Sequence, residues 1–232
     1  TVRGARLPPP EADVFRDMRP YQRRAAQSLV SHDGTDLTLR WGKVLLPCGA
    51  GKTFVIAKMA HDVVRGVAGG RVLIVVLEAT NASQHVVLCE RAGLRCCVCA
   101  GEGGTGDDRA RIAAADVVVV SYSMIGTSRA AVTRDVLLAR FTVVAWDEAH
   151  TLPAATHAHR LQGLLSGARH VFLTASTARL DGGWSTLFAD CPTLFELTLP
   201  EALRLGVVHP VRHTTWLVPP DAADAAPGAS RF

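Results

Sequence analysis

Two pairs of reactive side chains stand out in the sequence, Lys52-Thr53 and Asp147-Glu148. A lysine and a threonine at the end of a glycine-containing turn can bind phosphate oxygens and ligate Mg²⁺, respectively. An aspartate and a glutamate at the end of a strand can hold that Mg²⁺ and activate a water molecule. The two pairs together therefore predict a site for ATP and Mg²⁺.

The lysine-threonine pair closes a turn that reads Leu-Pro-Cys-Gly-Ala-Gly-Lys-Thr over residues 46–53. The turn follows an apolar run and precedes a helical pattern, so backbone N–H groups and a helix N-terminus can surround an anion. Because the first glycine of the general phosphate-loop motif is replaced by Leu46, a chance glycine-rich turn is the alternative. The predicted nucleotide-binding residues of this turn are Pro47, Cys48, Gly49, Ala50, Gly51, Lys52 and Thr53.

The acidic pair directly follows the apolar run 143–146, as expected for a buried strand that ends in carboxylates. Asp147 would hold Mg²⁺ opposite Thr53, and Glu148 would orient the attacking water. Acidic residues also cap solvated helix starts, which is the structural alternative. We predict Lys52, Asp147 and Glu148 as catalytic residues, and Thr53 and Asp147 as the metal ligands.

The rest of the pattern predicts an α/β domain that brings these residues together. Apolar, β-branched runs alternate with segments long enough for crossover helices, one of which should follow Thr53 and end near Gly66. Continuous apolar runs are typical of strands covered on both faces. We therefore expect a doubly wound, mainly parallel sheet with helices on both faces. Its strands should include residues 44–46, 72–77, 94–98, 117–120, 143–146 and 171–173.

The composition suits a globular protein with a polyanionic partner but does not identify that partner. The 232 residues are 48% hydrophobic and 20% charged, with a formal net charge of +4. No apolar run approaches the roughly 20 residues that a membrane-spanning helix needs, so we expect no membrane partner. The opening residues also lack the apolar segment of a signal peptide.

Four of the six cysteines lie between residues 89 and 99. Zinc sites favour paired cysteines with two residues between them, whereas Cys96, Cys97 and Cys99 share one strand-like run. Strand alternation would direct Cys97 and Cys99 to one face of the sheet and Cys96 to the other. Burial as small apolar side chains is the expected role, zinc binding is the alternative, and a reducing compartment is expected.

Three segments resemble the motifs of superfamily 2 helicases. Gly-Ala-Gly-Lys-Thr, Asp-Glu-Ala-His and Leu173-Thr174-Ala175-Ser176 are similar to motifs I, II and III. The resemblance implies a RecA-like P-loop NTPase lobe in which motif III couples the ATP site to the nucleic-acid site. It also implies a coupling role for His150, for which a hydrogen-bonded core histidine is the alternative. The implied coupling residues are His150, Thr174, Ala175 and Ser176.

Other segments are more similar to XPB, the DNA translocase subunit of TFIIH, and to its archaeal and bacterial relatives. Arg19-Pro20-Tyr21-Gln22 matches the opening of that motor, with a plain helix start as the alternative. The match implies that Gln22 reads the adenine and that Arg19 also belongs to the nucleotide-binding residues. Pro47-Cys48-Gly49, 121–126 and 147–154 are also similar, and the resemblance covers about residues 18–219. The implied DNA contacts are Thr80, Ser121, Tyr122, Arg179 and Asp181.

The sequence departs from XPB at two places. Leu180 stands between Arg179 and Asp181 where XPB has a glutamate implied to help open duplex DNA. Because leucine neither carries charge nor accepts hydrogen bonds, the resemblance supports ATP binding better than strand opening. After the loosely matching motif Ia, residues 78–84, His85 replaces a tryptophan of the family.

We expect residues 1–17 to form a surface N-terminal segment, 18–211 the first motor lobe, and 212–232 a linker toward a second RecA-like lobe outside this sequence. The second lobe would supply motifs IV to VI and an arginine finger, which contributes about 10³- to 10⁵-fold to hydrolysis. The chain alone should therefore bind nucleotide weakly and hydrolyse it poorly.

The XPB resemblance implies an ATP-dependent double-stranded DNA helicase or translocase acting in transcription initiation or nucleotide excision repair. Its implied partners are double-stranded DNA, the second lobe, and TFIIH-like or repair-complex subunits. Its location would be the nucleus in a eukaryote and the cytoplasm otherwise. Two alternatives stay open: an RNA helicase or restriction-type translocase of superfamily 2, and a divergent paralogue that acts mainly as a scaffold.

Overall fold

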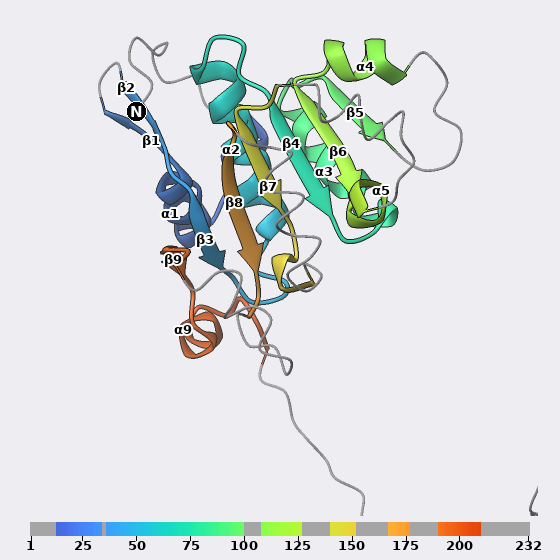
Figure 1. The fold of residues 1–232 in the computed structure, drawn as a ribbon. Coiled ribbons are helices and arrows are strands. Elements are labelled where there is room, and N and C mark those ends of the chain that lie inside the picture. Colours follow the sequence, from blue (N-terminus) through green and yellow to red (C-terminus); the bar gives the residue numbers. More distant parts are fainter. Residues whose placement is uncertain are drawn as a thin grey trace, which may run out of the picture.

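The computed structural model describes residues 13–33, 36–99, 108–126, 140–151, 167–176 and 190–209. Within these ranges one sheet of seven strands has the order β5-β6-β4-β7-β8-β3-β9 (Figure 1). Every neighbouring pair in this sheet is parallel. The strands are β3 (Gly42–Leu45), β4 (Val72–Val76), β5 (Cys96–Cys99), β6 (Val117–Ser121), β7 (Val143–Trp146), β8 (Arg169–Thr174) and β9 (Thr193–Glu196).

Helices and short elements surround this sheet. A separate antiparallel pair, β1 and β2, precedes it in the chain. The elements are η1 (Asp13–Phe15), α1 (Pro20–Leu29), β1 (Val30–Asp33), β2 (Asp36–Leu39), α2 (Lys52–Gly66), α3 (Ala79–Arg91), α4 (Asp108–Ala114), α5 (Tyr122–Gly126), η2 (Ala149–Thr151) and α9 (Leu199–Arg204).

The sheet separates two apolar cores. On one face α1, α2 and α3 pack over alternate strand residues such as Ile74 and Val119. On the other face Leu73 and Trp146 pack with Ile112 of α4. Because alternate residues of one strand point to opposite faces, a strand with a core on each side must be apolar throughout. The predicted α/β class with helices on both faces is therefore confirmed.

The parallel sheet brings the two reactive pairs to one edge. β8 lies between β3 and β7, with Leu45 opposite Thr174 and Trp146 opposite Phe172. The carboxyl ends of these three strands point to the same side of the molecule (Figure 1). The residues that follow β3 and β7 in the chain therefore meet there, which is the usual ligand-binding edge of an open α/β sheet.

All six predicted strands are present, with ends that differ by up to two residues from the expected ranges. The predicted helix after Thr53 begins at Lys52 and ends at Gly66. Among the described strands, the antiparallel pair β1–β2 and the edge strand β9 were not predicted. The cysteines alternate as expected, since Cys97 and Cys99 belong to one core and Cys96 contacts the other.

The prediction that residues 1–17 lie on the surface is wrong at Phe15. This side chain is fully buried in the core under α1 and α2. Its ring packs edge-on against the His61 ring, with 5.6 Å between the ring centroids. The Lys58 ammonium lies 5.9 Å from the centroid of the Phe15 ring. Burial of a phenylalanine side chain stabilises the fold by about 1.5–3 kcal/mol. This gain explains why Phe15 is buried although its sequence neighbours are polar.

The predicted linker, residues 212–232, lies outside the described residues, as do residues 1–12. Among the helices that the structure describes, none combines the length and the apolar character needed to cross a bilayer.

Truncating Ile74 should destabilise the domain. Ile74 is fully buried at the centre of the sheet, so Ile74→Ala leaves a cavity and should lower the free energy of unfolding by about 2–5 kcal/mol. Leu199→Ala, at a side chain that is 59% exposed, is the matched control and should change it by less than about 0.5 kcal/mol. Urea unfolding followed by circular dichroism measures both, and equal losses would contradict the described core.

Candidate nucleotide-binding site

The phosphate loop joins β3 to α2 and turns at two glycines with left-handed backbone. Gly49 has a φ of 77° and Gly51 a φ of 83°. Glycine adopts this conformation at low cost because it has no Cβ. Lys52 is the first residue of α2 and is 8% exposed. The first N–H groups of a helix have no partner inside the helix, so this end of α2 can donate to an anion.

Gln22, on α1, supports the loop from the side. Its amide nitrogen donates to the Ala50 carbonyl at 3.0 Å, and its amide oxygen accepts from the Arg19 N–H at 2.9 Å. The Tyr21 hydroxyl donates to the same Ala50 carbonyl at 2.9 Å. Each end of the Gln22 amide keeps capacity for one more hydrogen bond. Neither Gln22 nor Arg19 is among the residues that line the cavity beside the loop, and adenine binding by Gln22 stays a prediction.

The acidic pair follows β7 in a constrained backbone. Glu148 has a φ of 49°, the only positive φ of a non-glycine residue in the described part of the chain. Such a conformation costs on the order of 1–3 kcal/mol and is typical of functional sites. The Glu148 N–H donates to Asp147 Oδ1 at 3.0 Å, which ties the two residues together. Asp147 Oδ2 lies 3.0 Å from His85 Nε2.

The two reactive pairs meet through an ion pair. Lys52 Nζ lies 3.1 Å from Glu148 Oε1. The second oxygen, Oε2, is buried and has no hydrogen-bond partner among the described residues, although His150 Nδ1 lies 3.3 Å away. A buried carboxylate oxygen with a free lone pair can accept a proton from a water molecule, which is what a general base must do.

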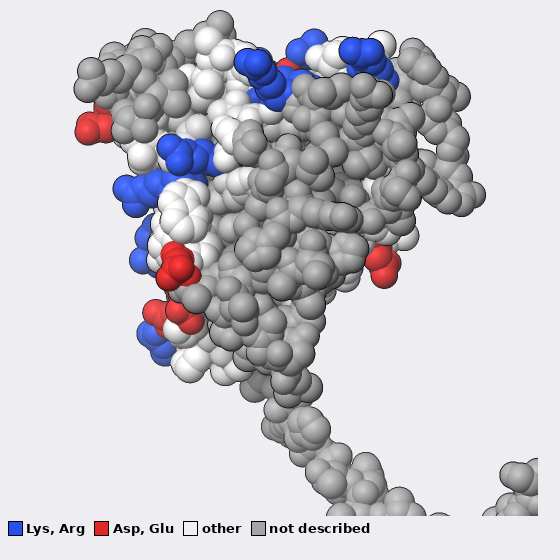
Figure 2. All heavy atoms as spheres, in the orientation of Figure 1, with Lys and Arg blue, Asp and Glu red and all other residues white. Residues whose placement is uncertain are grey.

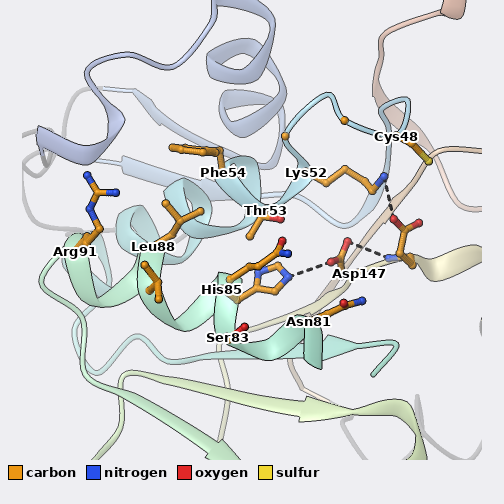
Figure 3. Close-up of a pocket in the computed structure, with 15 residues that line it drawn as sticks. Cys48, Lys52, Thr53, Phe54, Asn81, Ser83, His85, Leu88, Arg91 and Asp147 are labelled. Atoms are coloured by element: carbon orange, nitrogen blue, oxygen red, sulfur yellow. Dashed lines mark hydrogen bonds and ion pairs between the residues drawn. The ribbon is translucent and has the colours of Figure 1, made fainter. Parts of the chain in front are cut away.

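A cavity of about 730 Å³ opens beside the loop, between the start of α2 and α3 (Figure 3). Its size is typical of a small-molecule site. Figure 3 shows the Lys52 amine and the His85 ring both directed toward the acidic pair. The far end of the cavity is lined by Phe54, Leu88 and Arg91.

The residues present fit a magnesium nucleoside triphosphate. Thr53 and Asp147 both line the cavity, where they would hold Mg²⁺. Lys52 forms an ion pair with the Glu148 carboxylate, so its ammonium lies where it could bind a phosphate oxygen instead. The described residues contain no cluster of three or more His, Cys, Asp or Glu side chains that could hold a metal alone. Mg²⁺ in nucleotide sites usually takes one or two protein oxygens, with waters and phosphates completing the shell.

The predicted coupling residues lie next to the acidic pair. His150 Nδ1 is 3.1 Å from the hydroxyl of Thr174, at the end of β8. The Thr174 hydroxyl donates to the Ser176 carbonyl at 2.9 Å, so His150 must be the donor to Thr174. This contact joins the strand ends of β7 and β8, and the coupling role itself stays a prediction.

The predicted DNA contacts differ in how available they are. Thr80 is exposed, whereas the Ser121 hydroxyl is buried and lies 2.9 Å from that of Ser123. The Tyr122 hydroxyl donates to the Asp147 carbonyl at 3.0 Å. Burial, with the charges of Asp147 and Glu148, raises the pKa of Tyr122 well above its usual value. Arg179, Asp181 and the intervening Leu180 lie outside the described residues.

Sequence reasoning missed the contact between His85 and Asp147. It identified His85 only as a departure from the XPB pattern. A sequence signal was available, because Ala82, His85 and Cys89 have the spacing of one helix face that is otherwise apolar. The partner of His85 could not be read from that spacing, since Asp147 follows a different strand.

This architecture is that of a RecA-like lobe of the superfamily 2 helicase type. The chain belongs to the family described as type III restriction enzyme, res subunit, whose model matches residues 16–179, more than half of the chain. No curated protein matches the chain at the sequence level.

Several solved structures share the fold. The UvsW helicase from bacteriophage T4 is 18% identical with a TM-score of 0.57, over 79% of this chain and 61% of that one. The DUF1998 helicase MrfA is 14% identical with a TM-score of 0.59, over 82% of this chain and 33% of that one. A nuclease-deletion mutant of the type ISP restriction-modification enzyme LlaGI, in complex with a DNA substrate mimic, is 15% identical with a TM-score of 0.57. This match covers 83% of this chain and 21% of that one. The chain thus spans less than two thirds of each of these proteins.

Gly51→Ala should weaken nucleotide binding more than Gly49→Ala. Both positions have left-handed backbone, but a Cβ at Gly51 would clash with the Gln22 amide, whereas nothing lies within 4 Å at Gly49. To relieve the clash, Gln22 or the loop must shift, which breaks the Gln22 hydrogen bond to Ala50 and distorts the loop, and a loss of roughly 5-fold or more in affinity (about 1 kcal/mol) is expected. Titration with a fluorescent ATP analogue measures this affinity. In a Gln22→Ala background the two variants should become equal, and a persisting difference would contradict this explanation.

Proposed function

We propose that the chain is the ATP-binding lobe of a superfamily 2 motor that translocates on double-stranded DNA. The carrying observation is the ion pair between Lys52 and Glu148, which joins the phosphate loop to the acidic strand end inside one cavity. In this proposal Lys52 binds the phosphates, Thr53 and Asp147 hold Mg²⁺, and Glu148 orients the attacking water. The bound metal ion supplies charge neutralisation between the phosphates.

A restriction-type or related DNA translocase is the favoured member of this class. The family description names a restriction enzyme subunit, and one structure with the same fold is a restriction-modification enzyme bound to a DNA substrate mimic. A translocase can follow a duplex without separating its strands. That activity agrees with Leu180, which cannot replace the glutamate implied in strand opening.

An XPB-type role in transcription initiation or nucleotide excision repair is the second candidate. Arg19-Pro20-Tyr21-Gln22 supports it, because both Tyr21 and Gln22 contact the phosphate loop at Ala50. This candidate adds TFIIH-like or repair-complex subunits as partners and a nuclear location in a eukaryote.

In either case a second RecA-like lobe would complete the ATP site. Residues 18–211 would then form the first lobe and residues 212–232 the connection. The second lobe would supply the arginine finger, so ATP would be hydrolysed efficiently only between the two lobes.

Positive charge does not gather at the three predicted DNA contacts that the structure describes, Thr80, Ser121 and Tyr122. Exposed arginines gather near the amino ends of the strands, the edge opposite the nucleotide site, and Figure 2 shows basic side chains around α4 and the start of β4. This group includes Arg95, Arg109, Arg111 and Arg140. Thr80 instead follows the carboxyl end of β4, and Ser121 is the last residue of β6. At this edge the exposed Thr80 hydroxyl and the N-terminus of α3 would meet DNA phosphates, whereas the buried Ser121 would need to become exposed.

Lys52→Ala should weaken binding of ATP with Mg²⁺ by about 10- to 100-fold, because a charge-assisted hydrogen bond to phosphate is lost. Lys43→Ala is the matched control, since Lys43 lies on β3 before the phosphate loop and does not line the cavity. Isothermal titration calorimetry measures the ATP affinity of both variants, once thermal unfolding has shown that the two variants are equally stable. Equal affinities for the two variants would overturn the proposed function.

In a protein that contains both lobes, ATP hydrolysis should be stimulated more by duplex DNA than by structured RNA. Glu148→Gln should retain nucleotide binding but lower this hydrolysis by about 10²- to 10⁴-fold, because the general base is lost. Coupled ATPase assays measure both effects.

Stronger stimulation by RNA would support the RNA helicase alternative instead. Unchanged hydrolysis and unchanged function of Glu148→Gln would favour the scaffold alternative. Displacement of a triplex-forming strand without unwinding of a plain duplex distinguishes translocation from strand separation.

A further inference from the structure

His85 is a polar side chain on the buried face of α3. It is 1% exposed, lines the cavity beside the phosphate loop, and shares its helix face with the buried residues Ala82, Leu88 and Cys89. A buried imidazole in such surroundings is costly unless it forms a hydrogen bond. The partner that the structure provides is the Asp147 carboxylate, with 3.0 Å between Nε2 and Oδ2.

The direction of this hydrogen bond follows from the two groups. An ionised carboxylate only accepts, so Nε2 carries the hydrogen and donates it to Asp147. Nδ1 of His85 is buried and has no partner in the described ranges.

Asp147 is held by contacts from several segments of the chain. Its Oδ1 accepts the Glu148 N–H, its carbonyl accepts the Tyr122 hydroxyl, and its own N–H donates to the Val75 carbonyl. Among the described residues, His85 supplies the one side-chain donor to Oδ2. With one hydrogen bond on each carboxylate oxygen, both oxygens retain a lone pair for a cation.

We propose that His85 is a positioning residue for Asp147, which orients the carboxylate so that it can ligate the nucleotide-bound metal ion. This inference rests on the proposed function, because it takes Asp147 as the metal ligand. Metal-ligating side chains are usually oriented by a hydrogen bond from a neighbouring residue. Loss of such a neighbour costs about 10- to 100-fold in metal affinity or activity.

Direct ligation of the metal by the imidazole is less suited to this site. Mg²⁺ strongly prefers oxygen ligands, and imidazole suits softer metals such as Zn²⁺ or Cu²⁺. The His85 Nε2 atom is also already engaged with Asp147.

The test compares His85→Leu, which removes the donor, with His85→Gln, which keeps a neutral N–H donor at similar reach. Glu90→Gln, at an exposed position on the same helix, is the control. The 232-residue chain is titrated with Mn²⁺ in the presence of the ATP analogue AMP-PNP, and free Mn²⁺ is followed by electron paramagnetic resonance. AMP-PNP binding is measured separately in EDTA.

His85→Leu should weaken Mn²⁺ binding by about 10- to 100-fold, while binding of metal-free AMP-PNP should change by less than about threefold. His85→Gln should restore most of the Mn²⁺ affinity, and Glu90→Gln should match the wild type. This metal-selective loss distinguishes positioning from packing, because a packing defect would weaken both measurements together.

Three results would overturn the inference. An equal loss with and without metal would reduce His85 to a packing residue. A directly coordinated ¹⁴N in the pulsed spectrum of the wild-type Mn²⁺ complex would make it a ligand. Binding that depends on Lys52 but is indifferent to His85 would overturn this inference alone, whereas a wild-type chain that binds no AMP-PNP with Mn²⁺ would overturn the proposed function as well.

Discussion

The adjacency of β3, β8 and β7 in a parallel sheet is the constraint on which the site depends. It brings the end of the phosphate loop and the end of β7 together, so that Lys52 and Glu148 form an ion pair at 3.1 Å. A charged lysine and a carboxylate at low exposure stabilise each other only at close range, and losing one would leave the other desolvated. The same adjacency lets His150 donate to Thr174 and so joins the ends of β7 and β8.

Asp147 forms hydrogen bonds with three other elements of the domain, α3, β4 and α5. Its side chain contacts α3 through His85, and its backbone contacts β4 through Val75 and the start of α5 through Tyr122. α3 also carries Thr80 near its first turn, on the exposed surface. An acidic side chain with contacts of this kind is held by tertiary structure rather than by its own strand. In the proposed function, these contacts would link the nucleotide state to the nucleic-acid contacts.

The strands and the phosphate loop could be predicted because their signals are local. The run 117–120 is apolar at every position, and the glycines of the loop precede Lys52-Thr53 at a helix start. β9 is short and only partly buried, so its pattern resembles a loop until its pairing with β3 is known. Phe15 was misjudged because its polar and proline-rich neighbours outweighed one aromatic residue whose burial depends on α2.

The amino-acid sequence by itself determined the α/β class, six of the seven strands of the main sheet, and the chemical identity of Lys52, Thr53, Asp147 and Glu148. These follow from periodicity and from the side chains present, which require no knowledge of distant neighbours. Only the tertiary structure decided that His85 donates to Asp147, that Gln22 supports the loop at Ala50, and that the arginines gather at the opposite edge. Each of these depends on which strands become neighbours, and sheet order is set by packing between segments far apart in the chain.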